Sequence, residues 1–437
     1  MKTVAIFTMG CRANQADSAI LEGMLAREGW RLVDTKEPAD AYILNTCTVT
    51  NNADQEARYL IRRLHRQNPE ACILVTGCSA QVNPKALAGV EGVAFVVGNT
   101  QKKSILDLLK QSKPLVPEIM VEDIFQEEAI FSSDFSSYSK NTRALLKIQD
   151  GCNQMCSYCV IPFARGKNRS LLPQLVMDEL HRLSEIGYYE AVLTGIHIGT
   201  YGRDLSPQTD LLALMKRIED EVPIHRVRLS SIDPEEVTEE MIEFLSGSKI
   251  FCAHLHIPVQ SGEDQILKLM RRRYTAQEFL DLGVKLKEKI PGVCLGTDIM
   301  PGFPYENEER FEKSYRLMQE SPLDYLHVFP YSAKEKTRAA NFQDQVSQAQ
   351  KRERVSKMTA LSKEKRNQFY ESQKGSIQEI ILEEKAMHFP EHFSDKIRGV
   401  SRNFISVYVV ANEDLKGKLV SCKITGYEGD YVFGEII

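Results

Sequence analysis

The stretch ALLKIQDGCNQMCSYCVIPFARG (144–166) joins a short apolar segment to three closely spaced cysteines. Its apolar part, LLKI (145–148), has the length and composition of a buried β-strand. Cys152, Cys156 and Cys159 follow in the pattern Cys-x3-Cys-x2-Cys. If this strand opens a parallel α/β series, its carboxyl end lies on the face where catalytic groups collect. The stretch therefore places three thiols on the functional face of an α/β domain.

This spacing is typical of ligands to an iron–sulfur cluster. Three thiolates from one loop can hold three irons of a 4Fe-4S cubane and leave the fourth iron open. An open iron can chelate the amino and carboxylate groups of S-adenosylmethionine, and an electron from the cluster then breaks the sulfonium bond. The alternative is a zinc site, but structural zinc usually uses paired Cys-x2-Cys halves and no second pair is present. The spacing resembles that of the radical S-adenosylmethionine superfamily.

Five further strand patterns follow the cysteine loop, with helical patterns between them. Six strand–helix units predict a partial parallel (β/α)6 barrel within residues 141–371, ending in one long charged helix (346–374). The six predicted strands are LLKI (145–148), EAVLT (190–194), RVRLS (226–230), HLHIP (254–258), LGTDIM (295–300) and YLHVF (325–329).

Residues 1–110 form a separate series of short apolar runs and amphipathic helices, which predicts a doubly wound parallel sheet. Cys11, Cys47 and Cys78 each follow one of these runs within about four residues. Carboxyl ends of parallel strands share one edge of a sheet, so the three thiols are expected to converge there and to hold a second cluster. A single cysteine at a strand end is often only a small buried hydrophobe. We interpret the other four as such buried thiols: Cys72, Cys252, Cys294 and Cys422.

Two more segments complete the chain. Residues 111–140 lose the periodic pattern and are expected to form a linker. From Gly375 the sequence changes to short alternating strands separated by Gly and Asn, which predicts a small all-β barrel for residues 372–437.

Bulk properties restrict the class of protein. A chain of 437 residues is long enough for two to four domains. A net charge of −5 gives no overall attraction to nucleic acid, so any RNA contact depends on local surface. No apolar run approaches the roughly 18 residues of a membrane span, and the start (1–11) resembles a first strand rather than a secretory signal. We therefore expect a cytoplasmic protein without membrane contact, in which the ten cysteines are metal ligands or buried thiols.

Both cysteine triplets and the C-terminal barrel together resemble the methylthiotransferase family of radical S-adenosylmethionine enzymes. The resemblance spans essentially the whole chain and implies an N-terminal methylthiotransferase domain, a radical core and a C-terminal TRAM domain. Its signatures are GCRANQAD (10–17), NTCTVT (45–50), GCSAQ (77–81), GCNQMCSYCVIPFARG (151–166), VLTGIHIGTYG (192–202), HIPVQSG (256–262) and TDIMPGFP (297–304).

The family inserts a methylthio group at an unactivated C–H carbon, on a tRNA base or on a ribosomal protein. The compact ARGKNRS (164–170) and KIQDGCN (147–153) look most like the branch that acts on carbon 2 of N6-threonylcarbamoyladenosine beside the anticodon of tRNA. The resemblance implies two 4Fe-4S clusters and two S-adenosylmethionine molecules per turnover. One molecule methylates sulfur held at the N-terminal cluster, and the other is cleaved at the Cys152 cluster to generate the radical. An external electron donor and a sulfur source are implied as well.

The resemblance also suggests residues that contact the cofactor. Tyr158, inside the cluster loop, can flank its adenine, and Thr194 and Gly195 resemble the segment that meets the methionyl amine. Arg165 is expected to meet either the cofactor carboxylate or an RNA phosphate. Weaker candidates, for which an ordinary strand-end hydrogen bond is equally consistent, are Arg228, Ser230, Gln260 and Asp298.

The C-terminal barrel is an RNA-binding module by resemblance only. Five aromatic residues can stack on unpaired bases or pack in its core: Phe404, Tyr408, Tyr427, Tyr431 and Phe433.

Three alternatives remain open. The protein can be a methylthiotransferase of the same family whose substrate is isopentenyladenosine in tRNA or an aspartate of a ribosomal protein. The N-terminal domain can lack a cluster. The protein can also be a non-enzymatic, zinc-containing RNA-binding protein.

Overall fold

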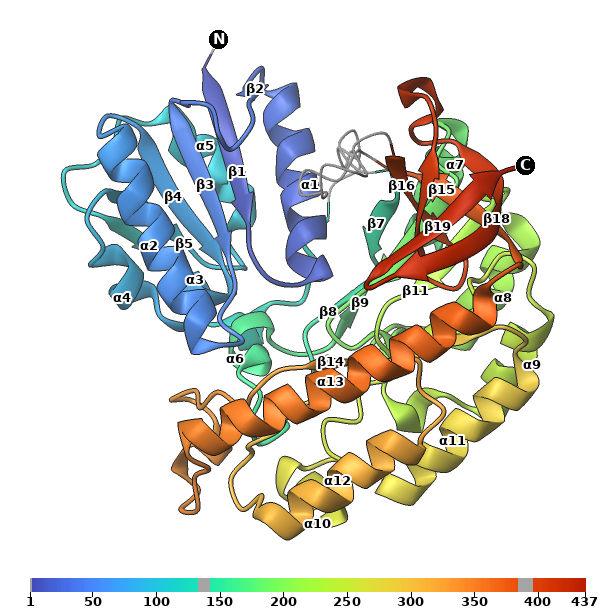
Figure 1. Ribbon diagram of the computed structural model, residues 1–437. Coiled ribbons are helices and arrows are strands. Elements are labelled where there is room, and N and C mark those ends of the chain that lie inside the picture. Colours follow the sequence, from blue (N-terminus) through green and yellow to red (C-terminus); the bar gives the residue numbers. More distant parts are fainter. Residues whose placement is uncertain (1, 133–141, 384–395) are drawn as a thin grey trace.

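The computed structural model describes residues 2–132, 142–383 and 396–437 (Figure 1). The N-terminal part is a six-stranded parallel sheet in the order β2-β1-β3-β4-β5-β6. This confirms the predicted doubly wound domain. The strands are β1 (Thr3–Thr8), β2 (Arg31–Leu32), β3 (Ala41–Thr46), β4 (Cys72–Gly77), β5 (Val93–Val97) and β6 (Glu118–Met120).

Helices cover both faces of this sheet because its central strands are apolar on both sides. One core contains Leu21 and Leu25 packed with Ile43 and Leu74, and a second core on the other face contains Ile61 packed with the strands. The helices are α1 (Arg12–Arg27), α2 (Asn51–Gln67), α3 (Cys78–Val82), α4 (Pro84–Ala88) and α5 (Ile105–Lys110).

Part of the segment expected to be a linker belongs to this sheet. β6 (Glu118–Met120) pairs in parallel with β5, and a 3-10 turn at Ile124–Gln126 contacts helix α6. Residues 133–141 lie outside the described residues. The three-residue strand escapes sequence analysis because it is short and half polar, and only its pairing with β5 identifies it.

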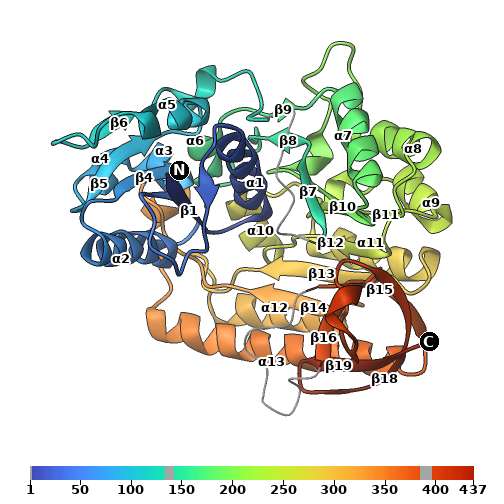
Figure 2. The same cartoon turned by 90° about the horizontal axis from the view of Figure 1, so that it is seen from above.

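The central part is the expected partial barrel. Two three-stranded parallel sheets, β11-β10-β7 and β12-β13-β14, are joined by a bridge between Val227 and Phe251. Figure 2 shows the six strands as an open arc with α1 beside β7. The strands are β7 (Ala144–Lys147), β10 (Glu190–Thr194), β11 (Arg226–Leu229), β12 (His254–His256), β13 (Cys294–Ile299) and β14 (Tyr325–Val328).

Amphipathic helices pack outside the arc, and a short hairpin follows β7. The alternating residues Ala191, Leu193 and Val227 point into the core beneath these helices, so Glu190, Arg226 and Arg228 point into the barrel interior. The remaining elements are β8 (Gln149–Asp150), α6 (Ile161–Arg165), β9 (Arg169–Ser170), α7 (Pro173–Glu185), α8 (Leu211–Glu221), α9 (Glu239–Gly247), α10 (Asp264–Met270), α11 (Ala276–Lys289) and α12 (Glu308–Glu320).

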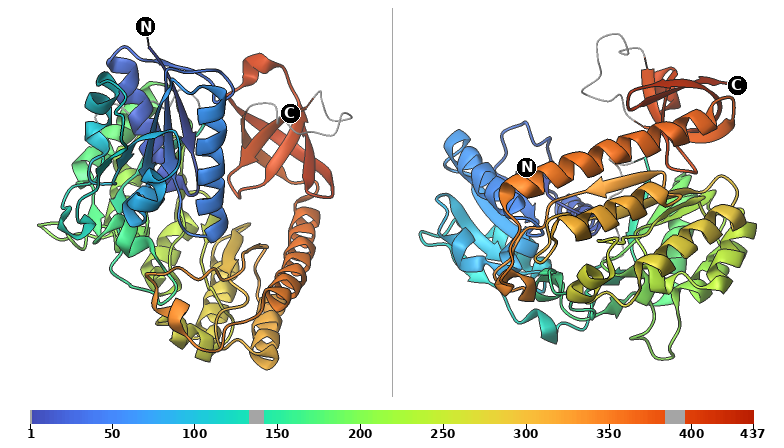
Figure 3. Two further views of the ribbon diagram at one scale, coloured as in Figure 1. Left: turned by 90° about the vertical axis from the view of Figure 1, so that its left-hand side faces the viewer. Right: turned by 60° about the horizontal axis from the view of Figure 1, so that its bottom comes forward.

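A long helix, α13 (Gln348–Gln373), packs on β14 and leads to the C-terminal barrel (Figure 3). That barrel is closed, in the order β15-β16-β17-β19-β18, as its alternating pattern predicted. Its strands are β15 (Ile377–Leu382), β16 (Lys396–Ser401), β17 (Ser406–Val410), β18 (Leu419–Glu428) and β19 (Tyr431–Ile436). Among the described residues, none of the helices has both the length and the apolarity to cross a membrane.

Candidate functional site

The cysteines of the first motif lie in the loop between the hairpin strand β8 and helix α6. The loop is held closely against the chain that leaves α6, since the Cys152 N–H donates to the Gly166 carbonyl at 3.0 Å. Gly151 has a φ of +74°, and a Cβ there would lie 1.8 Å from the carbonyl oxygen of Lys167. Only glycine fits this position, so the Gly-Cys pair at the start of the motif has a steric cause.

Nitrogen donors lie beside the sulfur atoms of Cys152 and Cys156. The backbone N–H of Gln154 lies 3.4 Å from Cys152 Sγ, Arg272 Nη1 lies 3.7 Å from Cys156 Sγ, and His197 Nδ1 lies 3.5 Å from Cys152 Sγ. Donors and positive charge beside thiolates stabilise an anionic cluster and tune its electronics. These surroundings fit an iron–sulfur site.

His197 was not singled out from the sequence. Burial lowers its pKa, but hydrogen bonding to Cys152 and to Glu236 outweighs burial and raises the pKa to about 10. Its Nε2 lies 3.0 Å from a carboxylate oxygen of Glu236. The only sequence signal was its place inside VLTGIHIGTYG (192–202), whereas Arg272, in a run of three arginines, carried none.

The second triplet converges as predicted. Cys11 is the N-cap of α1, Cys47 follows β3, and Cys78 begins α3 directly after β4. β1, β3 and β4 are neighbours in the sheet, so the three cysteines share its carboxyl edge. Gly10, at φ +85°, allows the loop to approach Cys47, because a Cβ there would lie 2.7 Å from Cys47 Sγ. Burial, together with the nearby Cys78, raises the pKa of the Cys47 thiol to about 12.

The spacing of the sulfur atoms bears on which metal group each triplet could hold. Zn–S bonds of about 2.3 Å place two sulfur ligands roughly 3.8 Å apart. In neither triplet do the three Sγ atoms all lie within 4.8 Å of one another. The larger cubane, in which each sulfur ligates a different iron, suits this spacing better.

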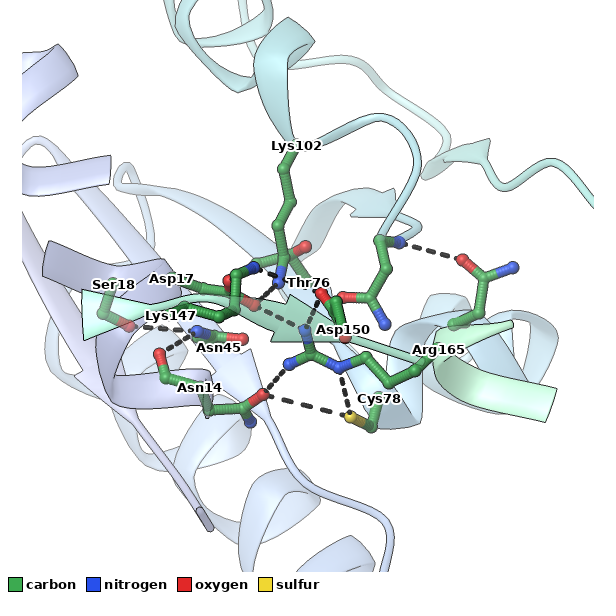
Figure 4. Close-up of polar contacts among 12 residues, drawn as sticks. Asn14, Asp17, Ser18, Asn45, Thr76, Cys78, Lys102, Lys147, Asp150 and Arg165 are labelled. Carbon is green, nitrogen blue, oxygen red and sulfur yellow. Dashed lines mark hydrogen bonds and ion pairs between the residues drawn. The ribbon is translucent and has the colours of Figure 1, made fainter. Parts of the chain in front are cut away.

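A buried ionic network crosses the interface between the N-terminal domain and the radical core and reaches Cys78 (Figure 4). Asp17, on α1, forms ion pairs with Lys102 of its own domain and with Lys147 and Arg165 of the radical core. Burial alone would raise the pKa of Asp17, but these three cations hold it well below its usual range. Asp150 adds a second carboxylate, whose Oδ2 lies 3.1 Å from Lys147 Nζ and 3.1 Å from Arg165 Nη1.

Arg165 reaches the N-terminal cysteines from the radical core. Its Nη2 donates to Asn14 Oδ1, and its Nε lies 3.4 Å from Cys78 Sγ. The side chain is 1% exposed and its charge is balanced by Asp17 and Asp150. Neither of the two roles expected from the sequence fits this position, because the guanidinium is occupied by the domain interface.

Four of the predicted cofactor contacts lie at the strand ends beside the Cys152 loop. Thr194 ends β10 and is buried. Gly195 follows it and packs closely on Gln149, because a Cβ at Gly195 would lie 2.7 Å from Gln149 Oε1. Ser230 and Gln260 are both 8% exposed, and Ser230 Oγ and Gln260 Oε1 have no hydrogen-bond partner among the described residues. Buried polar atoms without partners are costly, so these two positions suit a polar ligand such as S-adenosylmethionine.

The fifth contact, Tyr158, is half-buried. It packs beside a small cluster of apolar side chains that includes Met270, Met300 and Phe303.

Arg228 and Asp298 have other partners. Arg228 pairs with Glu190 and donates to the carbonyl oxygens of Ser401 and Arg402 in the C-terminal barrel, at 2.9 and 3.0 Å. It therefore anchors that barrel inside the arc rather than standing free for a cofactor.

Asp298 belongs to a chain of hydrogen-bonding side chains along the barrel interior. It accepts from His256 Nε2 at 2.9 Å and lies 3.5 Å from His327 Nδ1. Tyr325 Oη connects His256 with His254, at 3.2 and 2.8 Å.

None of the five C-terminal aromatic residues is exposed. Phe404 stacks on His254 with ring centroids 4.3 Å apart and so faces the radical core. Tyr408 packs against Tyr431, and Tyr427 against Tyr370. Phe433 is half-buried within 5.9 Å of Lys396 Nζ. These positions favour packing over base stacking for most of the set.

Comparisons with known proteins agree with this arrangement. Residues 3–98 match the model of the Uncharacterized protein family UPF0004, and residues 146–318 match the Radical SAM superfamily. The chain is 38% identical to the threonylcarbamoyladenosine tRNA methylthiotransferase MtaB of Bacillus subtilis, over 99% of this chain and 97% of the relative. It is 33% identical to the tRNA-2-methylthio-N(6)-dimethylallyladenosine synthase of Clostridium botulinum (strain Okra), over 99% and 96%.

A solved structure shares the fold. The radical S-adenosylmethionine methyltransferase TsrM of Kitasatospora setae superposes with a TM-score of 0.57 at 15% identity, over 77% of this chain and 76% of that chain. The similarity over the whole length, together with two cysteine triplets on domains that pack against each other, identifies the chain: it belongs to the methylthiotransferase family of radical S-adenosylmethionine enzymes.

Proposed function

We propose that this protein inserts a methylthio group at carbon 2 of N6-threonylcarbamoyladenosine next to the anticodon of tRNA. The observation that carries the proposal is the contact of Arg165, at the end of the helix that follows the radical loop, with Cys78 of the N-terminal triplet. Sulfur insertion needs a radical source and a sulfur carrier that face one substrate, and this interface brings the two sites together. The Bacillus subtilis relative supports the choice of nucleoside.

Each cysteine site has its own role in the proposed reaction. Cys152, Cys156 and Cys159 would hold the 4Fe-4S cluster, which supplies the electron that cleaves S-adenosylmethionine. Ser230 and Gln260 offer their free polar atoms to that cofactor, and Thr194 and Gly195 shape the strand end beneath it.

The second triplet is proposed to hold a second 4Fe-4S cluster and the sulfur that is transferred. Its ligands would be Cys11, Cys47 and Cys78. An external reductant and a sulfur source complete the reaction. Iron and sulfide analysis after anaerobic reconstitution tests the count: about eight irons per chain supports two cubanes, and zinc without sulfide supports the RNA-binding alternative.

Nucleoside analysis of tRNA tests the substrate. A strain that lacks the gene should lose 2-methylthio-N6-threonylcarbamoyladenosine and regain it when the gene is returned. Unchanged levels of this nucleoside would contradict the proposal. Loss of the 2-methylthio derivative of isopentenyladenosine instead would favour the second candidate, to which the 33% identical Clostridium relative points.

A further inference from the structure

Arg12 lies at the junction of all three parts of the molecule, and no carboxylate among the described residues forms an ion pair with it. It is the first residue of α1 and directly follows Cys11. Its contact across the interface is the ring of Phe404 from the C-terminal barrel, whose centroid lies 5.7 Å from Cζ. Within the described ranges it has no hydrogen bond or ion pair, although its side chain is partly buried.

The surroundings of Arg12 leave it unneutralised. Glu190, a carboxylate that acts on Arg12, is already paired with Arg143, Arg226 and Arg228. Two further cations, Arg143 and Arg228, repel the guanidinium of Arg12. This part of the barrel interior therefore carries an excess of positive charge that a bound anion would balance.

The substrate of the proposed reaction carries such an anion. N6-threonylcarbamoyladenosine ends in the α-carboxylate of threonine, whereas isopentenyladenosine has an uncharged substituent. Carbons 2 and 6 of adenine flank the same ring nitrogen, so a base that presents carbon 2 to the N-terminal cysteines extends its N6 substituent along the same edge. Arg12 lies one residue from Cys11, and its planar fork matches a carboxylate in two hydrogen bonds.

We propose that Arg12 binds the threonyl carboxylate of the target nucleoside and thereby selects it over uncharged N6 substituents. The inference rests on the proposed function. An uncharged N6 substituent would leave the guanidinium partly desolvated without a partner, which costs binding free energy. This cost adds to the binding free energy that the threonyl carboxylate gains, so both favour N6-threonylcarbamoyladenosine. Phe404, which also contacts Arg228 at 5.2 Å, closes the side of this position toward the C-terminal barrel.

A double-mutant cycle on binding tests this assignment. The reconstituted holoenzyme and Arg12→Gln are each titrated with three anticodon stem-loops that carry N6-threonylcarbamoyladenosine, its threonine carboxamide analogue, or unmodified adenosine. The unaltered enzyme should bind the carboxylate form about 10- to 100-fold more tightly than the carboxamide, the range for a charge-assisted hydrogen bond. Arg12→Gln should bind the two forms equally. Arg316→Gln, at an exposed arginine on α12, should keep the preference.

The other outcomes separate the possible failures. If Arg12→Gln weakens all three stem-loops equally, Arg12 contacts a backbone phosphate and the assignment is overturned. If the preference survives in Arg12→Gln, another residue reads the carboxylate and the assignment is likewise wrong. Iron content and the spectra of both clusters must stay unchanged in Arg12→Gln, since Cys11 is adjacent. If the unaltered enzyme forms methylthio product from the carboxylate stem-loop but binds the carboxamide equally well, only the inference about Arg12 is overturned. If the unaltered enzyme forms no product, the proposed function is overturned, and the inference with it.

Discussion

Arg165 Nε lies 3.4 Å from Cys78 Sγ, so a side chain of the radical core donates to a sulfur of the N-terminal site. The same guanidinium is bound by Asp17 from one domain and Asp150 from the other. One residue thus links the N-terminal domain to the radical core and also places a positive charge beside a sulfur of the N-terminal triplet.

Arg165→Lys should keep the ion pairs while removing the N–H donor to Cys78. We expect the reduction potential of the N-terminal cluster to fall by tens of millivolts, because the reduced and more negative state loses a hydrogen bond. Anaerobic redox titration followed by electron paramagnetic resonance measures the shift. Arg316→Lys, at an exposed arginine, is the control. An unchanged potential with full iron content would show that the contact has no electronic role.

Cys47→Ala should separate radical generation from sulfur transfer. We expect about four rather than eight irons per chain, continued cleavage of S-adenosylmethionine, and no methylthio product. Cys422→Ala replaces a buried cysteine in the core of the C-terminal barrel and should keep both clusters. Product formation by Cys47→Ala would mean that the N-terminal triplet carries no working cluster.

Gly195→Ala should impair the radical site through Gln149. The added Cβ would lie 2.7 Å from Gln149 Oε1, which accepts from the His197 N–H at 2.7 Å, while Gln149 Nε2 donates to the Gly151 carbonyl at 2.8 Å. We expect a loss of stability of about 1–3 kcal/mol and a slower cleavage of S-adenosylmethionine. Gly247→Ala, with nothing within 4 Å of the added Cβ, is the matched control. Equal cleavage rates in the two variants would remove Gly195 from the site.

Glu190→Gln should weaken the contact between the radical core and the C-terminal barrel. Burial alone would raise the pKa of Glu190, but Arg228, Arg226 and Arg143 together lower it to about 2. The carboxylate therefore contributes stability that is present above its unfolded pKa of about 4.5 and is lost as pH falls from there toward 2. We expect Glu190→Gln to cost about 3–5 kcal/mol at pH 7, because it removes the carboxylate that pairs with the buried Arg226 and Arg228.

Urea titrations at pH 7 and pH 3 check this expectation. The difference in unfolding free energy between the unaltered protein and Glu190→Gln should shrink at pH 3. A difference that is the same at both pH values would show that Glu190 does not stabilise the protein through its charge.

Much of the candidate site follows from local sequence. The loop of Cys152, Cys156 and Cys159 follows β7, and Cys11, Cys47 and Cys78 meet at one sheet edge, because strand ends and short loops are fixed by periodicity and glycine positions.

Other assignments depended on partners far away in the chain. β6 is defined by its pairing with β5. Arg228 was a weaker candidate for the cofactor because it lies in a predicted barrel strand, whereas the structure shows it donating to the carbonyl oxygens of Ser401 and Arg402 in the C-terminal barrel.

By itself, the sequence determined the two sets of thiols, the three folding units and the family. Each of these depends on residues that are close together in the chain or on the order of the predicted strands. Only the tertiary structure decided what the charged residues do. Asp17 joins the domains, Arg165 reaches Cys78, and Arg12 has no ion pair in the described part of the chain. These outcomes depend on which buried carboxylates the docked domains bring within reach. Ion pairing is a short-range property of the assembled interface, and no local pattern of residues encodes it.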